Sequence, residues 1–96
     1  MFFFALEANL YNVKIAIATN QENIDILFND IFKRYGKKSS TLKIQLAYAA
    51  YLTFQKNNPE KAITVLTDAM KVAKSKFQKA EIKLKLGDVH VFTGKY

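Results

Sequence analysis

Apolar residues recur at three- and four-residue steps along most of this chain, which is the period of an α-helix. Between residues 2 and 18 they occupy most sides of the predicted helix, with Leu6, Leu10, Val13 and Ile17 at the clearest helical spacing. A helix that is apolar on several sides is typical of burial on more than one face. No stretch alternates convincingly with the two-residue period of a strand. The pattern therefore predicts an all-α fold.

Four further segments repeat the helical pattern, and short polar connections separate them. The second carries Ile24, Leu27, Phe28, Ile31 and Tyr35. The third, from Leu42 to Gln55, carries Leu46, Ala47, Ala50, Tyr51 and Phe54 on one side. The fourth carries Ala62, Val65, Leu66, Ala69, Met70 and Ala73, and the fifth carries Ile82, Leu86, Val89 and Phe92. About five helices are expected.

Helix-end signals support these boundaries. Thr19 with Glu22, and Ser75 with Gln78, have the spacing of a capping box, in which two side chains satisfy backbone N–H groups at a helix start. Asn58-Pro59 combines a good N-cap with a proline at the first helical position, where its missing N–H is not needed. Gly36 and Gly94 are expected to end the second and fifth helices.

Three segments of the chain also resemble one another. Residues 86–96 (LGDVHVFTGKY) are similar to the middle of a tetratricopeptide repeat, with its Leu-Gly pair, aromatic position, Gly and Tyr. Residues 43–73 resemble a whole repeat, with Ala49-Ala50 in place of Leu-Gly and NNPEKA (residues 57–62) at the turn. Residues 5–35 resemble a fainter copy.

The resemblance implies antiparallel helix hairpins stacked in a right-handed superhelix, with about two and a half irregular repeats. They would cover residues 5–38, residues 43–75 and, as a half repeat, residues 76–96. Gly87 lies 37 residues after Ala50, whereas the family repeats every 34 residues or so. The chain is expected to be one domain or a fragment of a longer solenoid. The positions that would set the repeat are Ala50, Ala62, Ala69, Leu86, Gly87 and Gly94. The small residues Ala50, Ala62, Ala69 and Gly87 would stand where facing helices cross.

The resemblance further implies a protein-binding role for the concave surface formed by the first helix of each repeat. That surface would carry Asn9, Val13, Ala47, Tyr51, Phe54, Leu84, Asp88 and Val91. Because the set is mostly apolar, it suits an amphipathic helix or an apolar peptide. Stacking within a larger complex, or self-association, would cover the same surface.

The positive charge is concentrated in the second half of the chain. The net charge is +7, of which +2 falls before Ala49 and +5 from Ala49 onward. The lysines responsible are mainly Lys71, Lys74, Lys76, Lys79, Lys83 and Lys85. Such a cluster is typical of a solvated helix face, and it also attracts acidic partners or nucleic acid. RNA binding by this basic patch is therefore the alternative to protein binding.

Residues suited to catalysis are sparse. There is no Cys, His90 is the only His, and the three glycines are isolated, so no metal site, catalytic relay or phosphate loop is indicated. We expect neither an enzyme nor a cofactor. The apolar start of the chain, residues 1–6, is too short for a membrane span. These features favour an intracellular, cytoplasmic protein without a membrane partner.

Overall fold

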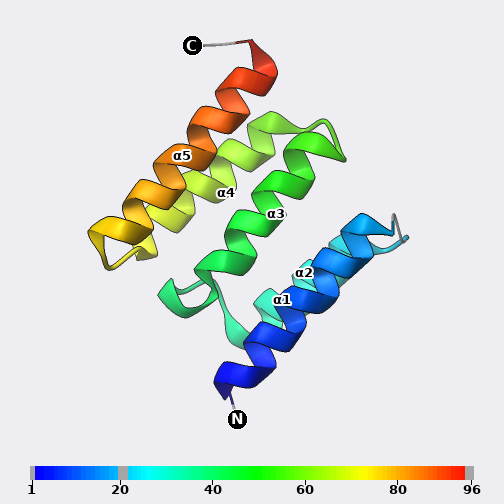
Figure 1. Cartoon of the computed structure of the whole chain (residues 1–96). Coiled ribbons are helices and arrows are strands. Elements are labelled where there is room, and N and C mark those ends of the chain that lie inside the picture. Colours follow the sequence, from blue (N-terminus) through cyan, green and yellow to red (C-terminus); the bar gives the residue numbers. More distant parts are fainter. Residues whose placement is uncertain (1, 20–21, 95–96) are drawn as a thin grey trace. The chain divides into compact units, whose positions relative to one another are not determined.

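The computed structural model describes residues 2–19 and 22–94, with side chains from residue 8 onward. The helices in these ranges are α1 (Phe2–Ala18), α2 (Ile24–Tyr35), α3 (Leu42–Phe54), α4 (Pro59–Val72) and α5 (Lys76–Thr93), and a 3₁₀ turn, η1 (Ser39–Thr41), precedes α3 (Figure 1). No strand occurs in the described ranges. The predicted all-α class is confirmed.

The chain divides into two compact units, Met1–Gly36 and Lys37–Tyr96. The first contains α1 and α2, which pack against each other. On α2 the buried residues are Ile24, Phe28, Ile31 and Phe32, which recur at helical spacing and form one stripe. Gly36 ends α2 with a φ of 77° and a ψ of 178°, a conformation that glycine adopts readily and other residues avoid.

The expected capping box at Thr19 and Glu22 is wrong. The Thr19 hydroxyl donates to the Ile15 carbonyl at 2.8 Å, so it lies at the end of α1 and not at the start of α2. Helix α2 begins at Ile24, after Asn23 in the left-handed conformation (φ 66°) that asparagine tolerates better than most residues. Asn20 and Gln21, which belong to the same motif, lie outside the described residues.

The second unit contains η1, α3, α4 and α5, and its three helices run antiparallel to one another in succession (Figure 1). Between α3 and α4 the chain reverses over two asparagines. Asn57 is left-handed (φ 52°), and the Asn58 N–H donates to the Leu52 carbonyl at 2.8 Å. The Asn58 side chain accepts from the Lys61 N–H, and Pro59 is the first residue of α4. The predicted start of this helix is confirmed.

Helix α3 is buried nearly all round, although the sequence pattern suggested one apolar side. Nine of its thirteen residues are buried, including Ile44, Tyr48 and Leu52. By contrast, Phe54, which shares the predicted apolar side, is 59% exposed. A helix with apolar residues on every side is typically buried on more than one face. The other helices of this unit pack on α3.

Helix α4 contacts both α3 and α5 and buries one face fully. Ala62, Leu66 and Ala69 have no exposed surface. The small side chains of Ala62 and Ala69 allow a neighbouring helix to approach closely. Helix α5 in turn buries Ile82 and Val89, and Phe92 meets Phe54 edge to face with ring centroids 5.4 Å apart.

Gly87 was expected to mark a close helix crossing, and this prediction is wrong. A Cβ built on Gly87 would meet no atom within 4 Å, and the residue is exposed. Its small size is therefore not required by packing within the described chain. Gly94, by contrast, ends α5 in the left-handed conformation (φ 74°), as expected.

We expect Ala62→Leu to destabilise the second unit by about 1–3 kcal/mol, because three extra carbon atoms would enter a fully buried position. Urea denaturation followed by circular dichroism measures the effect. Thr64→Leu is the matched control, since Thr64 is exposed on the same helix. Equal stability of the Ala62 variant and the wild type would contradict the packing of α4.

We also expect Gly87→Ala to stabilise the chain by about 1 kcal/mol, because alanine favours the helix and meets open space here. Thermal unfolding at low protein concentration measures the change. Gly94→Ala is the contrasting variant and should destabilise, since its φ is positive. A loss of stability in the Gly87 variant would show a tight contact at this position after all.

Candidate functional site

The predicted concave residues fall in both units, and they differ in accessibility. Asn9 and Val13 belong to the first unit, and the remaining six to the second. Val13 is only 1% exposed and Tyr51 only 5%, so the structure does not present these two side chains to a partner. Four of the eight are exposed, all in the second unit: Phe54, Leu84, Asp88 and Val91. The other two, Asn9 and Ala47, are half-buried.

Two of the exposed residues belong to a longer apolar line along α5. Phe77 is 73% exposed, Leu84 68% and Val91 60%. They are seven residues apart, and seven residues are close to two helical turns, so the three side chains lie on one side of α5. Ala80 and Gly87 lie between them and are also exposed. These five residues are called the α5 stripe below.

The core-facing residues of α5 fix the direction of the α5 stripe. Ile82 and Val89 are 0% and 3% exposed and pack within the second unit. Each is two residues from Leu84 or Val91, which is about 200° around the helix. The α5 stripe therefore points away from α3 and α4. Phe77 and Ala80 were not among the predicted site residues, although the seven-residue spacing of Phe77, Leu84 and Val91 can be read from the sequence.

The predicted basic patch is not one surface. Lys76, Lys79 and Lys83 are exposed along one side of α5. Lys85 follows Lys83 by two residues, and it therefore lies on the opposite side of the helix. The remaining two, Lys71 and Lys74, belong to the end of α4 and the link to α5. The lysines cluster in the sequence but separate in space.

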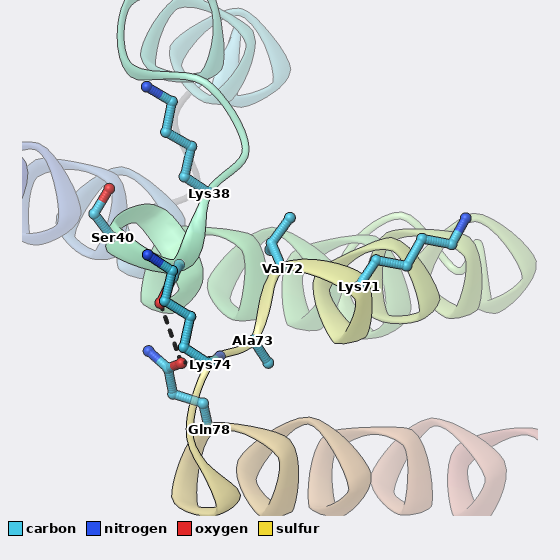
Figure 2. A pocket seen from close by; sticks show the side chains of 8 residues that line it. Lys38, Ser40, Lys71, Val72, Ala73, Lys74 and Gln78 are labelled. Carbon is cyan, nitrogen blue, oxygen red and sulfur yellow. Dashed lines mark hydrogen bonds between the residues drawn. The ribbon is translucent and has the colours of Figure 1, made fainter.

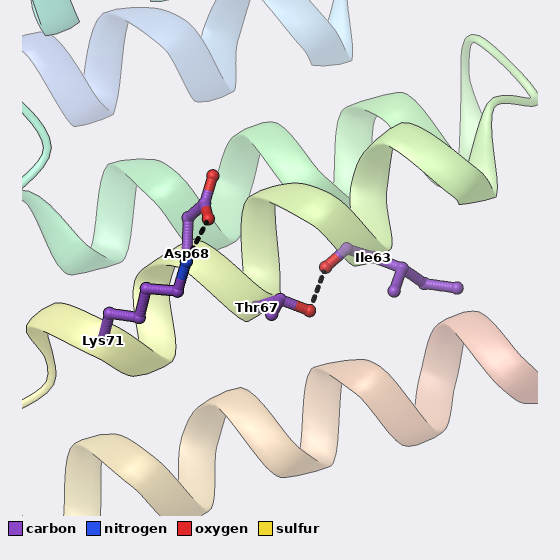
Figure 3. Close-up of polar contacts among 4 residues, drawn as sticks. All are labelled: Ile63, Thr67, Asp68 and Lys71. Atoms are coloured by element: carbon purple, nitrogen blue, oxygen red, sulfur yellow. Dashed lines mark hydrogen bonds and ion pairs between the residues drawn. The ribbon is translucent and has the colours of Figure 1, made fainter.

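Lys71 and Lys74 line an open groove together with Lys38, Ser39, Ser40, Val72, Ala73 and Gln78 (Figure 2). In Figure 2 the side chains of Lys38 and Lys71 extend in different directions and do not converge on one point. Lys71 also pairs with Asp68 (Figure 3), and its ammonium nitrogen lies 3.5 Å from the Asp68 carboxylate. This pair partly offsets the charge of Lys71. The groove is basic, but it does not form a compact anion site.

Gln78 forms hydrogen bonds to two other residues that line this groove. Its side-chain oxygen accepts from the Lys74 N–H at 2.8 Å and from the Ser39 hydroxyl at 3.1 Å. The Ser75 hydroxyl oxygen accepts from the Gln78 N–H at 3.0 Å, so Ser75 caps α5 as predicted. The reciprocal half of the capping box differs, because Gln78 bonds to Lys74 and not to the N–H of Ser75. Gln78 thereby joins η1 to the α4–α5 link.

A second feature of this unit is a small cavity among α3, α4 and α5. Ala50, Thr53, Leu66, Lys85 and Val89 contribute to its wall. Its volume is about 20 Å³, room for no more than about one water molecule. The Thr53 hydroxyl already donates to the Ala49 carbonyl at 2.8 Å. This cavity is too small for an organic ligand.

Chemically reactive groups do not gather within the described residues. No three His, Cys, Asp or Glu side chains there lie close enough to hold a metal ion. His90 is exposed on α5. None of the helices described combines the length and the apolar character needed to cross a membrane.

No family model, curated protein or solved structure matches the chain. The tetratricopeptide resemblance therefore rests on the residues quoted for it.

We expect Gln78→Ala to destabilise the second unit by about 1–2 kcal/mol, because two hydrogen bonds to one oxygen would be lost. A double-mutant cycle with Ser39→Ala, measured by urea denaturation, isolates the contact between η1 and the α4–α5 link. Purely additive effects of the two substitutions would contradict the proposed hydrogen bond between Ser39 and Gln78. Gln55→Ala, at an exposed position after α3, is the control.

Proposed function

We propose that this chain is a non-catalytic protein-interaction module that binds a helix of a protein partner against the α5 stripe. The observation that supports this proposal best is the exposure of Phe77, Leu84 and Val91 in one line on a helix that is otherwise anchored. Single exposed apolar residues are ordinary, but an aligned set of large ones is typical of an interaction surface. A helix that docks there would use anchors at the same helical spacing.

The energetics favour such docking. Each apolar side chain contributes about 25 cal/mol for every Å² of surface removed from water. Helix α5 is already ordered by the burial of Ile82 and Val89, so the partner's contacts do not have to compensate for folding it. Ala80 and Gly87 leave space between the large side chains, and this allows another helix to approach the backbone.

The tetratricopeptide resemblance is consistent with this role and extends it. The α3–α4 hairpin has the capped Asn58-Pro59 turn and the small Ala62 and Ala69 expected of a repeat. We propose that the chain acts as a scaffold of tetratricopeptide type, in which further helices add to α5. The exposed members of the predicted concave set that lie on α5, Leu84, Asp88 and Val91, would contact or border the same partner.

RNA binding remains the second candidate, and the groove lined by Lys38, Lys71 and Lys74 is the observation that favours it. Contacts with phosphates release counterions, so this function predicts steeply salt-dependent binding. The divergence of the Lys38 and Lys71 side chains makes it the less favoured reading (Figure 2). Titration of labelled single-stranded RNA at several salt concentrations separates the two, since protein docking on α5 predicts no such binding.

We expect the full chain to capture a protein partner from cell extract, and Leu84→Glu to abolish the capture. The substitution places a charge in the centre of the α5 stripe, where docking would remove it from water. Quantitative affinity purification measures the loss. Lys79→Glu is the matched control, because Lys79 is exposed on the same helix but outside the stripe. Recovery of the same proteins by the wild type and the Leu84 variant would contradict the proposal.

A further inference from the structure

Charged side chains of opposite sign border the two edges of the α5 stripe. Lys76 and Lys83 lie seven residues apart along one edge, and Glu81 and Asp88 lie seven residues apart along the other. His90 continues the basic edge. None of these four charged groups forms an ion pair within the part of the chain that the structure describes. The edges are therefore available to a partner.

The arrangement matches the heptad of a two-stranded coiled coil, written abcdefg. Phe77, Leu84 and Val91 take position a, and Ala80 and Gly87 take position d. The acidic edge falls at e and the basic edge at g. Position f, on the far side of the helix, holds Ile82 and Val89, which are buried in the unit. One face of α5 thus serves the core, and the opposite face has the pattern of a helix-pairing seam.

We infer that the occupant of the α5 stripe is α5 of a second copy of this chain, aligned parallel to the first. This inference rests on the proposed function and names the partner. Its basis is charge complementarity. In a parallel pair related by a two-fold axis along the helices, the g edge of each helix faces the e edge of the other. Lys76 would then meet the partner copy's Glu81, and Lys83 would meet its Asp88.

The antiparallel pair is disfavoured by the same charges. With the two-fold axis perpendicular to the helices, the acidic edge of one helix faces the acidic edge of the other, and the basic edge faces the basic edge. The carboxylates of Glu81 and Asp88 would then face carboxylates, and the ammonium groups of Lys76 and Lys83 would face one another. Like charges placed opposite each other across an interface oppose association. The charge pattern therefore selects a parallel orientation.

Gly87 gains an explanation in this arrangement. A glycine inside a helix costs about 1 kcal/mol relative to alanine, and no neighbour within the described chain requires it. In a parallel pair Gly87 would face Gly87 of the second copy, as Ala80 would face Ala80. These small residues let the backbones approach, while Leu84 and Val91 fill the layers between them.

The expected dimer is weak and depends on concentration. Its seam runs from Phe77 to Val91, about two heptads or roughly 20 Å of helix. Interfaces of this small class are typically transient. Sedimentation velocity of the purified full chain from about 1 µM to about 1 mM should therefore show a reversible shift from monomer to dimer. A monomer at every concentration would overturn the inference.

Substitutions test whether the α5 stripe forms the interface. We expect Leu84→Glu and, independently, Val91→Glu to weaken dimerisation by about tenfold or more. Circular dichroism verifies that both variants fold. Lys79→Glu should leave the dimer unchanged, because Lys79 lies outside the seam and its edges. Dimerisation of both stripe variants as strong as that of the wild type would overturn the assignment.

Cysteine cross-linking determines the orientation, since the natural chain contains no Cys. In the parallel pair Val91 faces Val91 of the second copy. The Val91→Cys variant alone should therefore form a disulfide-linked dimer rapidly on oxidation. In the antiparallel pair position a faces position d of the other copy, so Val91 would face Ala80, and only a mixture of Ala80→Cys and Val91→Cys would cross-link efficiently. Efficient cross-linking only in the mixture would overturn the parallel arrangement. Lys79→Cys is the control for random collision.

Failure of this inference and failure of the proposed function give different results. If the purified chain stays monomeric but captures another protein in a Leu84-dependent way, self-pairing is wrong and the proposed function stands. If the chain neither dimerises nor captures a protein through Leu84, both are wrong. Salt-sensitive binding of RNA by a monomer would favour the basic groove instead.

Discussion

The close packing of α4 against its neighbours determines the arrangement of the second unit. Ala62 and Ala69 are fully buried on α4, and Leu66 fills the space between them. Because these alanines are small, α3 and α5 can both lie close to α4. The Asn58-Pro59 start and the Ser75 cap fix where α4 and α5 begin. With the helix starts and the contact distance set, the side of α5 that enters the core is determined.

The exposed apolar side of α5, the proposed docking surface, follows from that constraint. Once Ile82 and Val89 are committed to the core, the residues about half a turn away must face outward. In an ordinary surface helix those positions are polar. In α5 they are Phe77, Leu84 and Val91, so the helix has apolar residues on two opposite sides. One apolar side stabilises the unit, and the other is the proposed docking surface.

The sequence predicted the helices well because their signals are local. Asn58 and Ser75 cap helices in the structure as expected, and Gly94 ends α5. The capping box predicted at Thr19 was wrong because its hydroxyl can bond either to a carbonyl of the preceding helix or to an N–H of the following one. The sequence spacing does not decide between the two, and in the structure the hydroxyl donates to the Ile15 carbonyl. The starts and ends of helices depend on a few neighbouring residues. Whether a hydroxyl such as that of Thr19 binds the preceding or the following helix depends on the folded chain.

Surface assignments were less successful because exposure depends on which helices pack together. The residues of α3 are apolar on all sides, so periodicity alone could not identify Phe54 as exposed and Tyr51 as buried. Gly87 was assigned to a helix crossing by resemblance, yet it faces open space. The lysines of the basic patch are neighbours in the sequence, but helix geometry places Lys83 and Lys85 on different sides. The local sequence pattern does not determine which of these side chains are exposed or which of them share a surface.

The account depends on the α5 stripe being the surface on which a second copy of the chain docks, while the opposite face of the same helix is core. Methyl NMR of the full chain across a concentration series tests this directly. The account predicts that the methyl signals of Leu84 and Val91 shift progressively with concentration, while those of Ile82 and Val89 stay constant. Signals of Leu84 and Val91 that do not change with concentration, or equal shifts on both faces of α5, would contradict it.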